Sequence, residues 1–286
     1  MQKPFFSIIV VSLNAGKEVK NTLDSILGQT YSDYEIILKD GGSTDESIVN
    51  LDKEEYFERN SCIKLITKKD KGIYDAMNQA VEEARGEYLI FLNCGDYFFD
   101  DQVLEKTAIK MKEAVVSKLS QKEVEEGKNT QIFYGNQWNR KQNTSVISSP
   151  QIGKFTLYRN VPCHQVCFYH RDLFSERGYD LTYKVRADYE HFLYSVIKKN
   201  AECYYLDEMI ASYEGGGYSE TKENKIISGK EHKEVTNKYL GKGLCFVYRF
   251  ILILTLAPLR SKINENPRLS AGYNRIKGLI YRRKIK

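Results

Sequence analysis

The sequence predicts an α/β fold in which helices flank a mainly parallel central sheet. Apolar, β-branched runs alternate with amphipathic helical stretches over the first part of the chain, and the links between them are short. Strand–helix–strand units of this kind form right-handed crossovers that place neighbouring strands parallel. A chain of 286 residues, 42% of them hydrophobic, can bury the core that such a sheet needs.

Four apolar runs are the predicted strands of this sheet. Residues 5–13 (FFSIIVVSL) are almost continuously apolar, as expected of a strand buried on both faces. Residues 34–39 (YEIILK), 62–67 (CIKLIT) and 88–92 (YLIFL) repeat this pattern further along the chain. The sequence therefore predicts four strands in succession, each followed by polar residues.

The segments between the first predicted strands have the apolar periodicity of helices. Val19, Leu23 and Ile26 form the stripe of a first helix, with Asn14 as its predicted N-cap and Gly28 as its C-cap.

Two more helices are predicted in the first half and one in the second. Ser43 followed by Glu46 has the capping-box spacing and predicts that the second helix starts at Ser43. Residues 73–84 carry the stripe of a third helix. Residues 191–197 (HFLYSVI) predict a helix with Asp188 at its N-terminus, where the helix dipole favours an ionised carboxylate.

Polar side chains follow all four predicted strands. Ser12 and Asn14 follow the first, Asp40 the second, Asp70 the third and residues 93–96 the fourth. Ligands of open α/β sheets bind at the carboxyl ends of the strands. Each residue alone could be a turn former, but four successive polar strand ends indicate a site.

The missing motifs narrow what this site could bind. The chain holds no G-x-G-x-x-G after the first strand and no G-x-x-x-x-G-K-[ST]. A phosphate site without a glycine cradle commonly uses a divalent metal, and carboxylate oxygens suit Mg²⁺ or Mn²⁺.

Three long stretches follow one another within residues 5–101: SIIVVSLNAGKEVKNTLDSILGQTY, EIILKDGGSTDES and DKGIYDAMNQAVEEARGEYLIFLNCGD. Together they resemble the family 2 glycosyltransferases of bacterial surface-polysaccharide synthesis, of the colanic-acid and capsule type. The similarity is thinner over residues 130–220. It implies a GT-A fold with a Rossmann-like sheet, a nucleotide-diphospho-sugar donor (UDP by family habit) and inversion at the anomeric carbon.

The resemblance also implies a donor site. By position, its residues are Ser12, Asn14, Asp40, Asp70, Gly72, Asn78 and Asn93. The first three would hold the base and ribose of the nucleotide. Many members have Arg where Met77 stands, which leaves Lys71 or Arg186 to help bind the diphosphate.

Residues 93–96 (NCGD) take the place of the D-x-D metal motif of this family. Only Asp96 keeps a carboxylate there, so Asp96 is the implied ligand of Mn²⁺ or Mg²⁺. A metal on the diphosphate oxygens stabilises the leaving group as negative charge develops.

Asp188 is the implied general base, since the base of the family occupies this position before the same kind of helix. A carboxylate can take the proton of the acceptor hydroxyl. The residues alone leave a plain N-cap as the alternative.

His164, Gly216 and Arg186 are candidates for acceptor or lid contacts. His164 precedes an apolar run as an H-Q pair does in this family. Gly216 lies in residues 214–219 (EGGGYS), for which a flexible linker is the alternative to a lid over the donor.

Three segments are expected: residues 1–101 as the nucleotide-sugar half, residues 102–221 as the acceptor half of the same domain, and residues 222–286 as a helical, basic C-terminal segment.

Residues 242–286 hold eleven Lys or Arg and one acid, although the whole chain has a net charge of only +5. Residues 244–259 are apolar, but as a helix they would extend roughly 24 Å, less than the roughly 30 Å of a hydrocarbon core. This helix is therefore expected to lie in an anionic membrane interface or against the catalytic domain.

The expected protein is cytoplasmic and peripheral on the inner face of the plasma membrane, because no signal peptide is visible and the six Cys are scattered. Its expected acceptor is a saccharide or a lipid-linked saccharide, and no nucleic acid is expected. A nucleotidyltransferase is one alternative, although a phosphate loop is lacking after the first strand. A nucleic-acid-binding protein is the other, although the basic tail has no reading motif.

Overall fold

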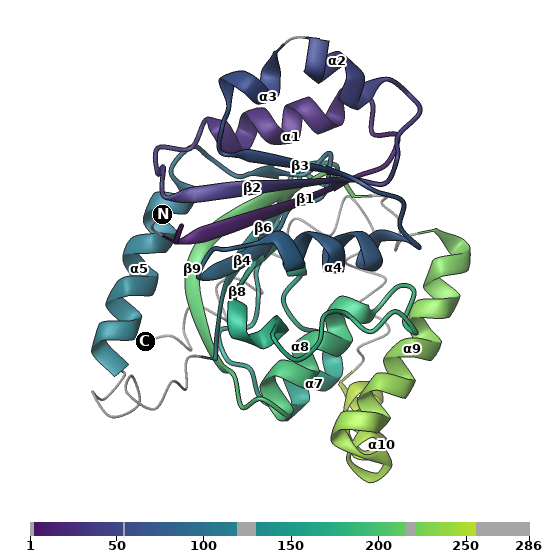
Figure 1. Ribbon diagram of the computed structural model, residues 1–286. Coiled ribbons are helices and arrows are strands. Elements are labelled where there is room, and N and C mark those ends of the chain that lie inside the picture. The colour runs from purple at the N-terminus through teal and green to yellow at the C-terminus, as the bar shows by residue number, and fades with distance from the viewer. Residues whose placement is uncertain (1–2, 54, 119–129, 216–220, 256–286) are drawn as a thin grey trace.

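The computed structural model describes residues 3–53, 55–118, 130–215 and 221–255. One curved sheet of nine strands runs through the molecule, with helices on both of its faces (Figure 1). The strand order is β3-β2-β1-β4-β8-β6-β9-β5, and β7 pairs with β6.

The first half of the chain forms the parallel part of the sheet. β1 pairs in parallel with β2 and β4, and β2 pairs in parallel with β3. The four strands predicted from the apolar runs are confirmed within two residues at each end. Their bounds and those of the intervening helices are β1 Phe6–Ser12, α1 Glu18–Leu27, β2 Tyr34–Asp40, α2 Ser47–Lys53, α3 Tyr56–Arg59, β3 Ile63–Thr67, α4 Ile73–Glu83 and β4 Tyr88–Phe91.

The second half extends the same sheet with mixed pairing. β8 is antiparallel to β4 and β6, whereas β6 and β9 run parallel, so the mainly parallel pattern belongs to the first half. The bounds are β5 Tyr97–Phe98, α5 Val103–Lys118, β6 Gln131–Asn139, β7 Thr144–Val146, α7 Lys154–Arg159, η1 His164–Val166, β8 Cys167–His170, η2 Arg171–Phe174, α8 Ala187–Ile197, β9 Glu202–Tyr213, α9 Lys222–Leu240 and α10 Lys242–Leu254.

The continuous apolar run of β1 reflects a sheet covered on both faces. Ile8 and Val10 belong to one hydrophobic cluster, which also contains residues of α1 and α5. Ile9 and Val11 belong to a second cluster with residues of α4 and α8 on the opposite face. Successive side chains of a strand point to opposite faces, so β1 needs an apolar residue at nearly every position.

Two predicted helix starts are wrong. α1 begins at Glu18 with Lys17 as its N-cap, and α2 begins at Ser47 rather than Ser43. Asn14 and Glu46 both have positive φ angles (50° and 61°), so neither has the backbone of a first-turn residue, although the Glu46 carbonyl accepts the N–H of Asn50 where α2 starts. Their segments form loops that bind each other, as described below. Gly28 is the C-cap of α1 as predicted.

No helix among the described residues is long and apolar enough to cross a bilayer.

Candidate active site

The first polar strand ends meet at one edge of the sheet. Ser12 and Asp40 are register partners on β1 and β2, and both are buried. Asp40 Oδ2 accepts the backbone N–H groups of Gly42 and Ser43 at 2.9 and 3.0 Å, and Asp40 Oδ1 accepts the Ser43 hydroxyl at 2.5 Å. Asp40 thus orders the loop after β2.

Asn14 connects the loops after β1 and β2. Its side-chain oxygen accepts the N–H of Thr44 at 2.8 Å, and its own N–H donates to the Ser43 hydroxyl oxygen at 2.8 Å. These two contacts explain why Asn14 and Ser43 are not helix caps, since their side chains hold the two loops together.

Asp70 lies beside this edge and pairs with a buried lysine. Lys39 Nζ contacts Asp70 Oδ2 at 2.9 Å, and the Lys39 side chain is 0% exposed. Asp70 Oδ1 also accepts the N–H of Gly72 at 3.1 Å. The sequence analysis does not predict a role for Lys39, although a Lys inside the apolar run EIILKD is the signal that could have indicated it.

Asn78 connects α4 to the second half of the chain. Its Nδ2 donates to the Tyr179 carbonyl at 2.9 Å and its Oδ1 accepts the Tyr179 N–H at 2.7 Å. A Cβ on Gly178 would lie 2.2 Å from Asn78 Oδ1, so only glycine permits this approach. Both polar groups of Asn78 are therefore engaged within the protein.

Asp96 ends the loop that follows β4. Gln165 Nε2 donates to Asp96 Oδ2. Burial raises the pKa of Asp96 to about 6, although the charges of His164 and Arg140 act in the opposite direction. A nearby cation would favour the ionised form of such a carboxylate.

Asp188 lies in the first turn of α8, as predicted. Its Oδ2 lies 3.1 Å from His164 Nδ1, and its Oδ1 accepts the Tyr74 hydroxyl at 2.9 Å. Burial acts to raise the pKa of Asp188, but the hydrogen bond and charge of His164, together with the Tyr74 hydroxyl, outweigh it and lower the pKa. Asp188 is therefore ionised at neutral pH.

His164 lies between the base candidate and the loop after β4. Its Nε2 lies 3.3 Å from the amide nitrogen of Asn93, and Asn93 Oδ1 is buried without a hydrogen-bond partner among the described residues. Burial acts to lower the pKa of His164, but the neighbouring Cys163 and Asp188 outweigh it and raise the pKa. A protonated ring donates from both nitrogens, so Nδ1–H of His164 can bind the Asp188 carboxylate.

One short turn thus connects the two acids. His164 contacts Asp188, and the next residue, Gln165, contacts Asp96. Both belong to η1. Sequence reasoning predicted Asp96, Asp188 and His164, but not the part played by Gln165.

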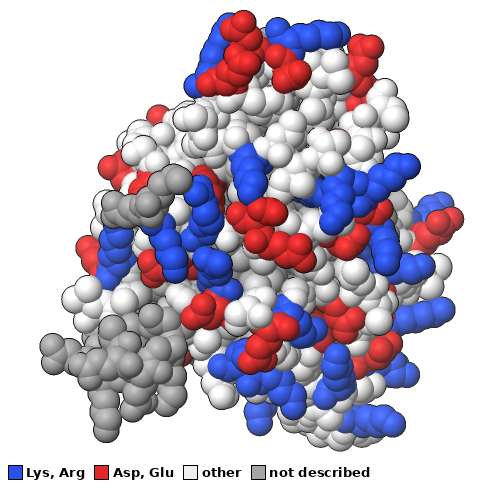
Figure 2. All heavy atoms as spheres, in the orientation of Figure 1, with Lys and Arg blue, Asp and Glu red and all other residues white. Residues whose placement is uncertain are grey.

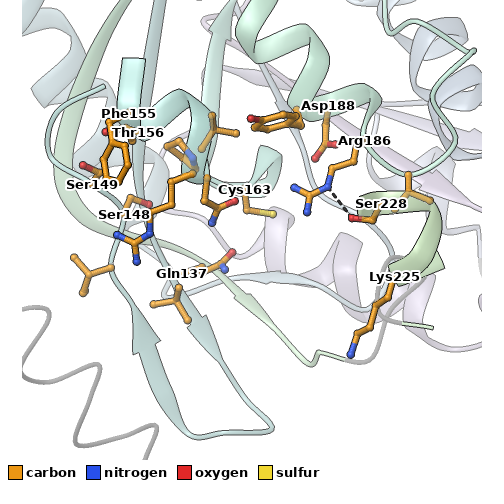
Figure 3. Close-up of a pocket in the computed structure, with 18 residues that line it drawn as sticks. Gln137, Ser148, Ser149, Phe155, Thr156, Cys163, Arg186, Asp188, Lys225 and Ser228 are labelled. Atoms are coloured by element: carbon orange, nitrogen blue, oxygen red, sulfur yellow. Dashed lines mark hydrogen bonds between the residues drawn. The ribbon is translucent and has the colours of Figure 1, made fainter. Parts of the chain in front are cut away.

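A cavity of about 610 Å³ opens beside Asp188. Figure 3 shows Asp188 and Arg186 on one wall and residues of β6, the segment after β7 and α7 across from them. Arg186 Nε donates to Ser228 Oγ on α9 at 2.8 Å. The lining residues are Gln137, Val146, Ile147, Ser148, Ser149, Phe155, Thr156, Arg159, Asn160, Val161, Pro162, Cys163, Val185, Arg186, Asp188, Tyr189, Lys225 and Ser228.

The segment before α8 is held by a carboxylate that sequence reasoning missed. Glu231 of α9 accepts the backbone N–H groups of Lys184, Val185 and Arg186 at 2.7, 3.0 and 2.9 Å. These hydrogen bonds hold the backbone just before Asp188, although Glu231 lies 43 residues further along the chain. Gly216 lies outside the described residues.

The residues around Asp96 fit a hard divalent cation. Gln165 occupies only Oδ2 of Asp96, and the buried Asn93 Oδ1 has no partner in the described part of the chain. Carboxylate and amide oxygens suit Mg²⁺ or Mn²⁺. No group of three or more His, Cys, Asp or Glu side chains with metal-site geometry occurs among the described residues, so a metal here would need further oxygens from a ligand or water.

Both a family profile and a curated protein match this chain. The profile of glycosyl transferase family 2 matches residues 7–177. A PGL/p-HBAD biosynthesis glycosyltransferase of Mycobacterium bovis (strain BCG / Pasteur 1173P2) is 35% identical over 225 residues, which cover 77% of this chain and 81% of that protein.

Solved structures share the architecture at low sequence identity. S. aureus TarS in complex with UDP-GlcNAc has a TM-score of 0.55 and 15% identity, covering 82% of this chain and 71% of the other. The mannosyltransferase PcManGT from Pyrobaculum calidifontis, in complex with GDP-Man and Mn²⁺, has a TM-score of 0.54 and 12% identity, covering 96% and 85%. These likenesses confirm the predicted GT-A fold.

Proposed function

The chain belongs to glycosyl transferase family 2 and is a glycosyltransferase, and on that premise we propose the parts its residues play. The enzyme transfers one hexosyl or N-acetylhexosaminyl group from a nucleotide-diphospho-sugar, with UDP as its nucleotide, to an acceptor hydroxyl. Asp188 is the general base, and Asp96 holds Mn²⁺ or Mg²⁺. The anomeric configuration is inverted.

One observation carries this proposal: consecutive residues of η1 contact the two acids, His164 on Asp188 and Gln165 on Asp96. A donor at Asp96 and an acceptor at Asp188 would therefore lie within one site. Attack on the sugar from the side opposite the phosphate requires this arrangement.

These groups account for the bond formed, the bond broken and the proton released in the proposed reaction. The acceptor oxygen attacks the anomeric carbon while the bond to the phosphate oxygen breaks, and the nucleoside diphosphate leaves with the electron pair. Asp188 takes the acceptor proton, which its ionised state allows. A divalent metal, when bound, would stabilise the charge on the departing diphosphate. His164 orients Asp188, and Gln165 orients Asp96.

The donor class is supported by the solved relatives, which hold UDP-GlcNAc in one case and GDP-Man with Mn²⁺ in the other. The edge built by Ser12, Asn14 and Asp40 is proposed for the nucleotide. We assign the cavity beside Asp188 to the acceptor, a saccharide on a lipid-linked surface-polysaccharide precursor such as that of a capsule.

A panel of nucleotide sugars with Mn²⁺ or Mg²⁺ tests this function. The correct donor raises the melting temperature, and turnover releases nucleoside diphosphate with inverted product stereochemistry by NMR. EDTA removes both the stabilisation and turnover. Release of pyrophosphate would instead indicate a nucleotidyltransferase and contradict the proposal.

We also propose that the C-terminal helix contacts a membrane surface, on the inner, cytoplasmic side. One side of α10 packs on α7, where the Tyr248 ring lies 5.2 Å from Phe155 and 5.5 Å from Tyr158. At i, i+4 and i+8 spacing, Phe246, Phe250 and Leu254 remain 75%, 56% and 66% exposed. The packing on α7 agrees with one of the two sequence-based alternatives, and the exposed apolar residues support the other, a helix in the membrane interface, which stays a proposal.

The charge around this helix suits anionic lipid. Residues 222–255 hold seven Lys or Arg and three Glu. Figure 2 shows Lys and Arg gathered along the right-hand edge of the molecule, over α9. Basic clusters beside an apolar helix face favour anionic bilayers. The basic tail at 256–286 lies outside the described residues.

Co-sedimentation with vesicles tests the membrane proposal. Phe246→Ser with Phe250→Ser should abolish binding to vesicles that contain phosphatidylglycerol, whereas Val116→Ser, an exposed apolar residue on α5, should not. Equal sedimentation of the α10 double variant and the unchanged protein would contradict it.

A further inference from the structure

We propose that the cavity beside Asp188 recognises an acceptor that carries an anionic group, a phosphate or a carboxylate, through Arg159, Arg186 and Lys225. This inference rests on the proposed function, since it takes the cavity as the acceptor site and names the chemistry of its ligand.

The three cations come from three different helices. Arg159 ends α7, Arg186 is the N-cap of α8, and Lys225 lies in the first turn of α9. In Figure 3 the Arg186 guanidinium points into the open space of the cavity, and Lys225 extends from the α9 side. Convergence of separate elements on one space is the arrangement expected of a binding site.

None of these cations is paired with an acid in the part of the chain that the structure describes. Among the described residues, no Asp or Glu lies within ion-pair distance of Arg159, Arg186 or Lys225. By contrast, Arg177 and Lys238, on the same half of the molecule, pair with the buried Glu190 at 2.8 and 2.9 Å. The cations of the cavity are thus available to a ligand.

The described wall of the cavity contains a single carboxylate. Among the lining residues that the structure describes, Asp188 is the only acid, and His164 and Tyr74 already engage it. Three cations against one engaged carboxylate give the cavity a positive potential, which favours an anionic ligand.

Arg186 is also positioned for such a ligand. Its Nε donates to Ser228 at 2.8 Å, and its guanidinium carbon lies 5.4 Å from the centre of the Tyr189 ring. Its backbone N–H is bound by Glu231. A side chain fixed in this way loses little conformational entropy when its two terminal nitrogens bind a phosphate or carboxylate oxygen.

The three cations line a different space from the one beside the proposed donor residues. Ser12, Asn14, Asp40, Asp70, Asn93 and Asp96 are all absent from the cavity lining. The lining does include Ser148, Ser149, Thr156 and Asn160, whose hydroxyl and amide groups suit a sugar. The anion is therefore expected on the acceptor rather than on the donor diphosphate.

Anion binding without turnover tests this inference. The protein is titrated with inorganic phosphate, glucuronate or neutral glucose at constant ionic strength. EDTA is present throughout, so that the metal-dependent donor site is not in use. The melting temperature reports binding. Alkylation of Cys163, which lines the cavity, locates it by peptide mass spectrometry, with Cys62 as the thiol outside it.

We expect phosphate, glucuronate or both to raise the melting temperature and slow Cys163 alkylation, while glucose does neither. Protection by phosphate alone assigns a phosphate-bearing acceptor, and protection by glucuronate assigns a carboxylate-bearing one. Arg186→Gln should weaken anion binding about tenfold, as the loss of a charge-assisted hydrogen bond does. Arg159→Gln and Lys225→Gln should each weaken it severalfold.

Lys230→Gln is the matched control, because it removes a charge from exposed α9 without touching the cavity. Equal effects of glucose and the anions would overturn the inference, as would anion binding that does not depend on Arg186. So would variants that weaken UDP binding in Mg²⁺ more than phosphate binding in EDTA. If no nucleotide sugar stabilises the protein, the proposed transferase roles are refuted. The anion experiment can still be interpreted in that case, because it uses no donor.

Discussion

Lys39 is a charged side chain in an environment that charged side chains seldom occupy. It is fully buried, and its ammonium group reaches Asp70 and the backbone carbonyls of Asp40 and Lys68 at once. A buried ammonium requires a charged partner and several acceptors. The pair therefore holds the loop after β3 against the end of β2, at the proposed nucleotide edge.

Replacement of Lys39 should destabilise the fold strongly. Lys39→Met leaves Asp70 uncompensated and should lower the free energy of unfolding by about 3–5 kcal/mol, measured by urea denaturation. The double variant Lys39→Met with Asp70→Asn should recover much of the loss. Lys64→Met, which removes an exposed pair with Glu83, should cost less than about 1 kcal/mol. Equal losses for both lysines would contradict this account.

The elements of the site depend on contacts that reach across the chain. Glu231 on α9 accepts three N–H groups of the segment before α8, and so fixes Arg186 and Asp188 from outside their own helix. Orphan N–H groups near a helix start are commonly satisfied by a local side chain, and here a distant one serves.

Glu231→Gln should therefore disturb the acceptor side selectively. A neutral amide keeps one acceptor oxygen for three donors, so we expect a loss of about 1–3 kcal/mol in unfolding free energy. The acceptor KM should rise severalfold while the dissociation constant of the donor changes less than twofold. Glu223→Gln, in the exposed first turn of α9, is the control. An equal rise of the donor constant would contradict the assigned position.

Elements with a strong apolar pattern could be predicted from sequence, and elements defined by distant contacts could not. β1 to β4 follow from their apolar runs, and α4 and α8 from their stripes. The starts of α1 and α2 were mispredicted because Asn14 and Ser43 hold two loops together instead of capping helices, and Glu46 lies one residue before α2. Likewise Asp96 and Asp188 were proposed as site residues from their motif positions, whereas the contacts of Tyr74, Gln165 and Glu231 depend on neighbours that only the fold brings near.

At the scale of the whole molecule, the two halves share one sheet and their buried histidines are mostly neutral. Burial lowers the pKa of His191 to about 3, and it also lowers the pKa values of His170 and His232. These are three of the four histidines in the chain. The unfolded chain binds protons at these positions near pH 6.5, and the folded chain does not.

Stability should therefore fall as the pH is lowered from 7 to 5. A group whose folded pKa is depressed below its unfolded value contributes less stability as pH drops below the unfolded pKa, about 6.5 here. The expected slope is up to about 1.4 kcal/mol per pH unit for each fully neutral histidine. Urea denaturation across this range measures it. His191→Phe should flatten the profile, and an unchanged slope in that variant would contradict the assignment.

Paired substitution of the two acids tests the central claim most directly, namely that Asp96 and Asp188 serve one reaction from the donor and acceptor sides. In parallel, donor affinity with Mn²⁺ and the rate of transfer are measured for Asp188→Asn and Asp96→Ala, with Asp52→Asn on the exposed face of α2 as control. We expect Asp188→Asn to bind donor within about twofold of the unchanged protein and to lose transfer at least a thousandfold, and Asp96→Ala to lose metal-dependent donor binding. Transfer that survives in Asp188→Asn, or metal-dependent donor binding that survives in Asp96→Ala, would contradict it.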